Sequence, residues 1–273
     1  MKPTAGAPLS ERLAHRLGGA GPPVVFANGG MMSYPAWEPV AAALRDDHAT
    51  LLFDFRGQLL SPGEPPADLA GLADDLAALL DAVGWESAHV VGTSFGALVA
   101  LTLAARSPER VRSLLLATVM DRATPAFDRE AAALRERLAG IARGGDREAF
   151  YDLLVAGVYS EGHRAAEAAT LAARRRHVGA LPLAWFAGLD RLLAAIEGFD
   201  LTAGLSAVRC PACVVVAEAD RVMDPARSRA LAAALGAELA VHPTAGHALV
   251  NEDPIWLAAT CRGFLARAEE MSP

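Results

Sequence analysis

The sequence lacks the features that mark several classes of protein. Its 273 residues carry 25 Lys and Arg against 32 Asp and Glu, a net charge of −7, so no broad basic excess exists to track a phosphate backbone. No apolar run approaches the ~18 residues of a membrane span. Residues 1–21 show no apolar segment followed by a small-residue cleavage pattern. We therefore expect a cytoplasmic protein that binds neither nucleic acid nor membrane.

Cysteine is also scarce, with three residues in the chain. Cys210 and Cys213 form a Cys-x-x-Cys pair, which is compatible with redox activity or with half of a zinc site. The sequence has no second such pair and no histidine pair at ligand spacing, and Cys213 opens an apolar strand. We therefore interpret Cys210, Cys213 and Cys261 as ordinary thiols and expect no metal and no organic cofactor.

Apolar residues are abundant, at 53% of the chain, and they fall into alternating strand and helix patterns. This alternation predicts an α/β fold with a mostly parallel, doubly wound sheet, long enough to bury one large core. A weak strand pattern covers residues 13–17. The clearer predicted strands are 24–27, 49–55, 88–91, 111–119, 213–217 and 238–241, and the helices between them are 36–44, 69–83, 97–105, 225–235 and 254–268.

The strand rhythm stops after Val119 and resumes at Cys213. The patterns between them are helical, over residues 128–142, 146–158, 163–178 and 183–196. An insertion at this place would lie over the strand ends, where α/β sheets bind their ligands. We expect an α/β core domain of residues 1–120 and 208–273, with a four-helix cap, or lid, of residues 121–207.

The most informative motif is Gly-x-Ser-x-Gly at residues 92–96, between an apolar strand and a helix. A strand–turn–helix with serine at its apex is the geometry of a serine nucleophile, because only glycine two residues before and after leaves room for so sharp a turn. The hydroxyl of Ser94 would then stand at the carboxyl end of the sheet. The following helix N-terminus would offer N–H groups to developing negative charge.

A serine nucleophile needs a histidine base, and the histidine needs a carboxylate to hold its tautomer. Asp220 and His247 each follow a predicted strand, on the same edge of the sheet as Ser94. Two other carboxylates are alternatives for the acid, because Asp224 is close to Asp220 and Asp121 follows the strand that ends at Val119.

A series of ordered motifs over about residues 22–268 resembles the α/β-hydrolase-fold superfamily, in its form with a helical cap. The resemblance rests on the strand and Asn-Gly-Gly of residues 23–30, the Asp-x-Arg-Gly loop of 54–61, Asp74-Asp75-Leu76, the 92–96 turn, the Ser-Pro-Glu-Arg-Val of 107–111, Asp220 and Gly246-His247.

The resemblance implies a role for each of these residues. Ser94 is the expected nucleophile, His247 the general base and then acid, and Asp220 the carboxylate that orients it. The oxyanion hole would be formed by the backbone N–H groups of Gly30 and Phe95. Two fixed donors of this kind stabilise a tetrahedral oxyanion by about 3 kcal/mol each.

Two departures bear on activity. Asn28 stands where the family usually has histidine, and Met31-Met32 follow, a combination that resembles a subgroup with enol-lactonases, esterases and 3-hydroxyacyl carrier-protein transacylases. Leu59 replaces the second glycine of the Asp-x-Arg-Gly loop, so that loop is expected to turn differently.

Apolar side chains near the strand ends and in the cap are candidates for the substrate pocket, which would then hold an apolar body. We interpret the basic run at residues 174–177 as a solvated helix face, with contact to an acidic substrate as the alternative. The candidate pocket residues are Met31, Met32, Met120, Trp185 and Phe186.

The sequence therefore predicts a serine hydrolase acting on a small-to-medium apolar carboxylic ester, lactone or thioester through an acyl-enzyme. The alternatives are an acyltransferase of the same fold with a carrier or coenzyme A thioester donor, a carbon–carbon bond hydrolase, and a cofactor-free perhydrolase. From another class comes a non-catalytic protein that binds a ligand or templates a cyclisation. The oligomeric state is left open, with a homodimer among the options.

Overall fold

The computed structural model describes residues 13–61 and 63–271. Their strands form one seven-stranded sheet in the order β1-β3-β2-β4-β5-β6-β7. β1 pairs with β3 antiparallel, and the other neighbours pair in parallel, so the predicted α/β fold class is confirmed. The strands are β1 (His15–Gly18), β2 (Pro23–Ala27), β3 (Ala49–Phe53), β4 (Ala88–Thr93), β5 (Val111–Ala117), β6 (Ala212–Ala217) and β7 (Glu238–His242).

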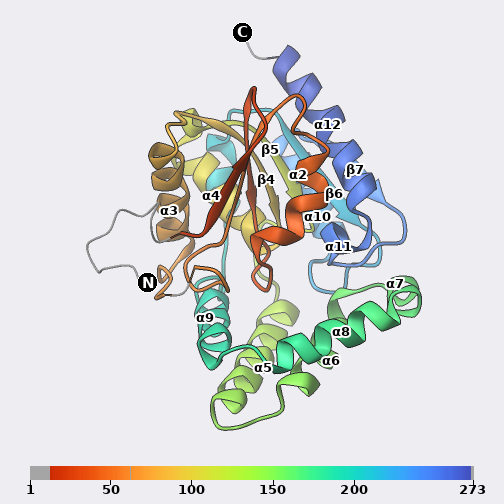
Figure 1. The fold of residues 1–273 in the computed structure, drawn as a ribbon. Coiled ribbons are helices and arrows are strands. Elements are labelled where there is room, and N and C mark those ends of the chain that lie inside the picture. Colours follow the sequence, from red (N-terminus) through yellow and green to blue (C-terminus); the bar gives the residue numbers. More distant parts are fainter. Residues whose placement is uncertain (1–12, 62, 272–273) are drawn as a thin grey trace.

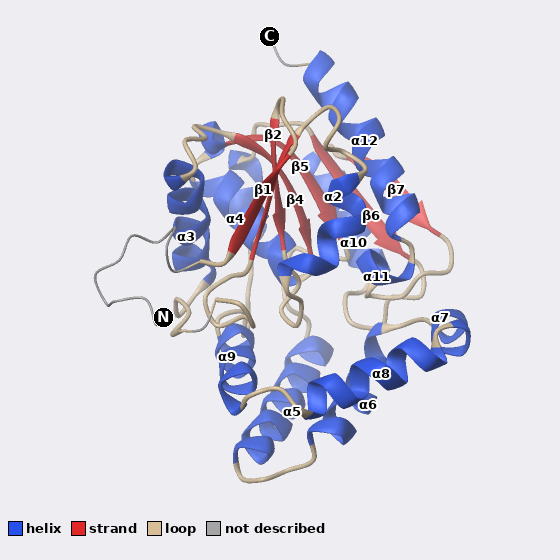
Figure 2. Ribbon diagram, viewed as in Figure 1, coloured by secondary structure: helices blue, strands red, loops and turns tan. Residues whose placement is uncertain are grey.

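Helices cover both faces of this sheet because strand side chains alternate between the faces. Val25 and Val90 pack in the apolar cluster that includes α3 (Leu69–Ala82), α4 (Phe95–Arg106) and α10 (Pro225–Leu235). Val24 and Val91 pack on the other face, in the cluster that includes α2 (Glu38–Ala42) and α12 (Pro254–Glu270). Figure 2 shows the strands in red between these two helical layers.

A block of helices between β5 and β6 lies beyond the carboxyl ends of the strands, at the bottom of Figure 1. We call residues 121–207 the cap, and the exact division between cap and core remains a prediction. Within the cap, α5 packs with α9, and α6 packs with α8. Its helices are α5 (Pro125–Ala142), α6 (Arg147–Val158), α7 (Glu161–Ala166), α8 (Ala168–Gly179), α9 (Leu183–Ala194) and the short 3-10 helix η3 (Thr202–Ala207).

The predicted single helix over residues 163–178 is wrong, and with it the four-helix cap. The chain begins α7 at Glu161 and breaks at Glu167, whose backbone leaves the helical region with φ −107 and ψ 23. Ser160 caps α7 by accepting a hydrogen bond from the amide of His163 at 3.2 Å, which sets an earlier start. Gly162 lies in the first turn of α7, and no glycine or proline occurs at residues 163–168 to signal the break.

Smaller differences occur at the ends of other elements. Residues 36–44, predicted as one helix, form the 3-10 turn η1 (Tyr34–Trp37) followed by α2. The short helix α11 (Leu249–Glu252) follows β7 and was not predicted. No helix in the described ranges is long and apolar enough to cross a membrane. Residues 1–12, which include most of the segment without a leader pattern, lie outside the described residues.

Two buried histidines lie far from the cap and share one carboxylate of α12. The Nε2 atoms of His48 and His89 lie 3.0 and 3.6 Å from Oε1 of Glu269. Nδ1 of His89 also contacts the Ser113 hydroxyl at 2.7 Å. Burial, with smaller contributions from the charges of Arg112 and His48, lowers the pKa of His89 to about 4.

Candidate active site

Ser94 stands on a strained turn between β4 and α4. Its φ of 52 and ψ of −120 are rare for a residue with a side chain, and such a conformation costs on the order of 1–3 kcal/mol. Both flanking glycines are required here. A Cβ on Gly92 would lie 2.8 Å from the Ala97 backbone, and a Cβ on Gly96 would lie 2.2 Å from the Ala27 carbonyl oxygen. The amide of Ser94 is tied to the Ala117 carbonyl of β5 at 2.9 Å.

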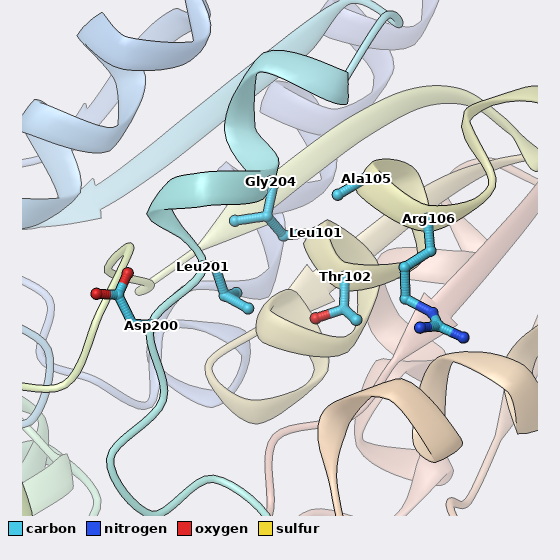
Figure 3. Close-up of a pocket in the computed structure, with 7 residues that line it drawn as sticks. All are labelled: Leu101, Thr102, Ala105, Arg106, Asp200, Leu201 and Gly204. Carbon is cyan, nitrogen blue, oxygen red and sulfur yellow. The ribbon is translucent and has the colours of Figure 1, made fainter.

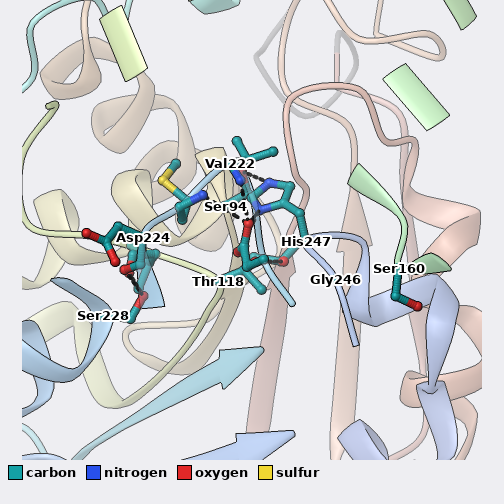
Figure 4. Close-up of polar contacts among 12 residues, drawn as sticks. Ser94, Thr118, Ser160, Val222, Asp224, Ser228, Gly246 and His247 are labelled. Atoms are coloured by element: carbon teal, nitrogen blue, oxygen red, sulfur yellow. Dashed lines mark hydrogen bonds and ion pairs between the residues drawn. The ribbon is translucent and has the colours of Figure 1, made fainter. Parts of the chain in front are cut away.

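The side chain of Ser94 is available for chemistry. It occupies the N-cap position of α4, yet it makes no cap hydrogen bond to the helix. Its Oγ instead lies 2.9 Å from Nε2 of His247 (Figure 4). The first amide of α4 belongs to Phe95, and the first amides of a helix have no carbonyl partner within the helix. A hydroxyl and a free amide therefore stand side by side at the end of β4.

His247 connects Ser94 to Asp220. Its Nδ1 lies 2.9 Å from Oδ2 and 3.1 Å from Oδ1 of Asp220. Oδ1 also accepts hydrogen bonds from the amides of Val222 and Met223 at 2.8 and 3.0 Å, which fixes the carboxylate. A proton on Nδ1 leaves the lone pair of Nε2 facing the serine hydroxyl. The arrangement has the geometry in which histidine accepts the proton of a serine.

The two other acids considered from sequence have different partners. Asp121 accepts hydrogen bonds from Arg227, one of them from Nε at 3.1 Å. Asp224 caps α10 by accepting the Ala226 amide at 2.9 Å, and it lies apart from His247 in Figure 4. The structure therefore brings Asp220, rather than Asp121 or Asp224, to His247.

A tight turn at the end of β2 passes beside Phe95. The amide of Met32 donates to the Gly29 carbonyl at 3.1 Å, and the Gly29 amide meets Sδ of Met32 at 3.3 Å. A Cβ on Gly30 would lie 3.8 Å from Cβ of Phe95, so the backbone of Gly30 approaches the first turn of α4. This places the two candidate oxyanion-hole residues next to each other, and their role remains a prediction.

The side chain of Gln58 binds the turn at Gly29 and Gly30, and the sequence analysis did not identify Gln58 as a functional residue. Its Nε2 donates to the carbonyls of Gly29 at 2.8 Å and Gly30 at 3.3 Å. Its Oε1 accepts from the Phe55 amide at 2.9 Å and from Asn28 Nδ2 at 3.0 Å. The side chain is 2% exposed, so each of its four bonds is made without competition from water. The 54–61 loop also contains Asp54, Arg56 and Ser61, so its composition did not single out Gln58.

Asn28 and Asp54 complete this buried network. Asn28 Nδ2 lies 2.9 Å from the Phe53 carbonyl oxygen and 3.0 Å from both Oδ1 of Asp54 and Oε1 of Gln58, so its two hydrogens are shared among three acceptors. Burial raises the pKa of Asp54, against the opposing effect of hydrogen bonds from Leu60, Tyr34, Ser33 and Asn28. Asn28 therefore joins β2 to the 54–61 loop, in the position where the family usually has histidine.

The candidate pocket residues fall into two groups. Met31 and Trp185 are partly buried and pack against the apolar cluster of the cap. Met120 and Phe186 are 1% and 2% exposed and belong to apolar clusters of the core and the cap. Met32 packs toward the α2 and α12 side of the sheet. Their assignment to a substrate pocket remains a prediction.

Two cavities in the described part of the chain are separate from Ser94. One, of about 170 Å³, lies between α4 and η3 and is shown in Figure 3. The other, of about 340 Å³, lies between α5 and α9 in the cap. Among residues 13–61 and 63–271, no group of three or more His, Cys, Asp or Glu side chains is placed to hold a metal ion. Cys210, Cys213 and Cys261 are free thiols, and burial raises the pKa of each.

Comparison with known proteins identifies the family. Residues 22–254 match the sequence model of the family described as alpha/beta hydrolase fold, which is most of the chain. The chain therefore belongs to the alpha/beta hydrolase fold family, and the resemblance predicted from its motifs is confirmed.

Individual relatives agree with this assignment. The chain is 31% identical over 258 residues to "Putative carbamate hydrolase RutD" of Pseudomonas savastanoi pv. phaseolicola, which covers 92% of this chain and 96% of that protein. The structure of MGS-M2, an alpha/beta hydrolase enzyme from a Medee basin deep-sea metagenome library, matches with a TM-score of 0.87 at 24% identity and covers 93% of this chain and 94% of that one. The enol-lactonase from Burkholderia xenovorans LB400 matches with a TM-score of 0.81 at 24% identity. The match covers 93% of this chain and 96% of the enol-lactonase chain. At these identities the two structures establish the fold alone. The family, together with the name of the relative at 31% identity, makes this chain a hydrolase of that fold.

Proposed function

We propose that the protein hydrolyses a small-to-medium apolar carboxylic ester, lactone or thioester through Ser94, His247 and Asp220. The observation that carries the proposal is the unbroken chain of contacts from Ser94 Oγ to His247 Nε2 at 2.9 Å and from His247 Nδ1 to Asp220 Oδ2 at 2.9 Å. A strained serine turn that leaves its hydroxyl uncapped supports the same role.

The reaction proceeds in two halves. Ser94 Oγ attacks the carbonyl carbon while His247 Nε2 takes its proton, and the carbonyl electron pair moves to oxygen. When the tetrahedral intermediate collapses, the bond to the leaving alcohol, enol or thiol breaks and His247 returns the proton to that group. Water then attacks the acyl-enzyme with His247 again as base, which releases the acid and restores the serine. Asp220 stays ionised and stabilises the imidazolium through both halves.

The oxyanion of each tetrahedral intermediate would be held by the amides of Gly30 and Phe95. Their backbones lie beside each other next to Ser94. Removing one such donor from an enzyme typically lowers kcat by about 10²–10³-fold. The position of the Gly30 amide therefore affects the rate. The Gln58 bonds to the two carbonyls of this turn give it a fixed position.

A carbamate is a second candidate substrate, because the relative with 31% identity is named a carbamate hydrolase. Esters, thioesters and carbamates all present a carbonyl carbon to a nucleophile. A carbamate differs in that this carbon also carries a nitrogen. The same serine attack would form a carbamoyl-enzyme in place of an acyl-enzyme. The geometry at Ser94 serves both substrate classes, and the substrate pocket decides between them.

The test is the hydrolysis of p-nitrophenyl esters of increasing acyl length, with p-nitrophenyl carbamates in parallel, by the wild type and Ser94→Ala. We expect hydrolysis by the wild type alone, and the preferred acyl length measures the pocket. Faster turnover of the carbamates at every length would assign the second substrate class. Hydrolysis that persists in Ser94→Ala, or its absence from the wild type on every substrate, overturns the proposal. The latter result would favour an acyltransferase with its own acceptor or a non-catalytic protein.

A further inference from the structure

The cap contacts the loop that carries His247 on both sides of that residue. The last residue of α6 and the two residues that join it to α7, residues 158–160, lie against residues 246–248. The amide of Ala248, just after His247, donates to the Val158 carbonyl at 2.9 Å. The amide of Gly246, just before His247, donates to Oε1 of Glu252 at 3.1 Å.

Glu252 joins these two segments through a single carboxylate. Its Oε1 also accepts from the Ser160 amide at 2.9 Å, and its Oε2 accepts from the Ser160 hydroxyl at 2.6 Å. One carboxylate oxygen therefore bonds both the cap backbone and the amide next to His247. We call the contacts among Ser160, Glu252 and Gly246 the clasp. Figure 4 shows Ser160 beside the loop that bears Gly246 and His247.

The approach at the clasp is too close for any residue but glycine at position 246. A Cβ there would lie 2.8 Å from the Ser160 nitrogen and 2.9 Å from both the Val158 carbonyl oxygen and Oε1 of Glu252. The two backbones are therefore in direct contact. A base that must stay within hydrogen-bond distance of Ser94 thus depends on a surface supplied by the cap.

We infer that Glu252 is a positioning residue for His247, and that the cap segment 158–160 forms part of the framework that holds the base. The inference rests on the proposed function of His247. With the clasp intact, Nε2 of His247 stays 2.9 Å from Ser94 Oγ. Without it, Gly246 loses its acceptor and Ser160 loses two bonds, so the loop relaxes and the proton transfer slows.

The variants separate positioning from bulk stability. Glu252→Ala removes both carboxylate oxygens, whereas Glu252→Gln keeps one oxygen able to accept the Gly246 and Ser160 amides. Ser160→Ala leaves Glu252 in place and removes two bonds of the Ser160 hydroxyl, the one to Glu252 and the one from the His163 amide at the start of α7, so it guards against a folding defect specific to the first variant. The matched control is Glu161→Gln, since Glu161 lies on the same cap turn and pairs with the exposed Arg221 at 3.2 Å without touching the clasp.

We expect Glu252→Ala to lower kcat by about 10- to 100-fold with little change in KM, because a misplacement near 1 Å can reduce a rate by that amount. Glu252→Gln should restore kcat to within about threefold of the wild type, Ser160→Ala should lower it severalfold, and Glu161→Gln should not change it. Active-site titration with a fluorophosphonate corrects each kcat for the fraction of folded enzyme.

A second readout does not depend on turnover. The proton on His247 Nδ1, bonded to Asp220, is expected to give a resolved downfield proton resonance, which Glu252→Ala should shift or broaden and Glu161→Gln should not. Wild-type kcat per titrated site together with an unchanged resonance in Glu252→Ala overturns the inference. If the wild type hydrolyses none of the substrates, the proposed function fails, while the resonance still decides whether the clasp positions His247.

Discussion

The cap meets the core at a second point, where two glycine backbones touch. Gly188, in the middle of α9, is buried against Gly57 of the 54–61 loop, and a Cβ on Gly188 would lie 2.0 Å from the Gly57 carbonyl oxygen. An ordinary contact needs about 3.4 Å, so in Gly188→Ala the helix and the loop must separate by about 1.4 Å. Gln58 follows Gly57 directly, and the displacement would therefore reach the turn at Gly29 and Gly30.

The expected effect has two parts. Overpacking of this kind destabilises a protein by about 1–3 kcal/mol. Displacement of the turn beside Phe95 adds a loss of kcat/KM of up to about 100-fold. The control is Gly140→Ala in α5, where an added Cβ would meet no atom within 4 Å. In a helix with open space, Gly→Ala stabilises by about 0.5–1 kcal/mol and should leave activity unchanged.

Urea unfolding at neutral pH gives the two free energies, and ester hydrolysis gives kcat/KM. Gly188→Ala and Gly140→Ala are the same chemical change in two cap helices, so helix propensity largely cancels between them. If Gly188→Ala proves as stable and as active as Gly140→Ala, the cap does not rest on the 54–61 loop and the reasoning is refuted.

Two further predictions concern buried polar groups. Gln58→Leu should lower kcat by about tenfold or more with KM retained, because the turn at Gly30 loses its donor. Ser61→Ala, in the same loop and equally buried but bonded to Ala14 and Asp54, should change stability without this split between kcat and KM. His89 should make stability depend on pH. Its pKa of about 4 in the folded protein lies below the unfolded value of 6.5, so the unfolded chain binds its proton first as the pH falls. The free energy of unfolding should therefore drop by about 3 kcal/mol between pH ~6.5 and ~4, and urea titrations should show this loss in the wild type but not in His89→Gln. Equal pH dependence in the two proteins would contradict the assignment.

Local sequence signals predicted the strands and the serine turn well, because their physical causes are local. The β-branched runs of β4 and β6 can form little else, and Gly92 is required by contacts within the turn itself. Gly96 is the exception, since the backbone that crowds it is that of Ala27 and Asn28, at the end of β2. The break at Glu167 was not predictable in the same way. There the direction of α7 is set by Ser160 and its contact with Glu252, which is 92 residues away in sequence.

The choice among three candidate acids shows the same limit. Asp121, Asp220 and Asp224 all follow strand ends, and the family resemblance favoured Asp220 without excluding the other two. Arg227 binds Asp121, and the start of α10 engages Asp224, so Asp220 is the acid that faces His247. Glu252 and Gln58 carry no motif of their own. Their importance depends on which backbones fold against them, which periodicity and spacing do not contain.

The position of the cap within the chain also orders the assembly of the protein during synthesis. β5 and β6 are neighbours in the sheet, yet residues 118–211 are made between them. The serine turn therefore leaves the ribosome long before Asp220 and His247. While the cap is translated, the edge of β5 that later pairs with β6 has no partner strand. An unpaired strand edge is prone to aggregation, and closure of so long a loop is slow. Substitutions in the cap should thus affect the yield of folded protein as well as its catalysis. Cap substitutions that slow folding should increase the dependence of this yield on chaperones, even where the structure of the folded core is unchanged.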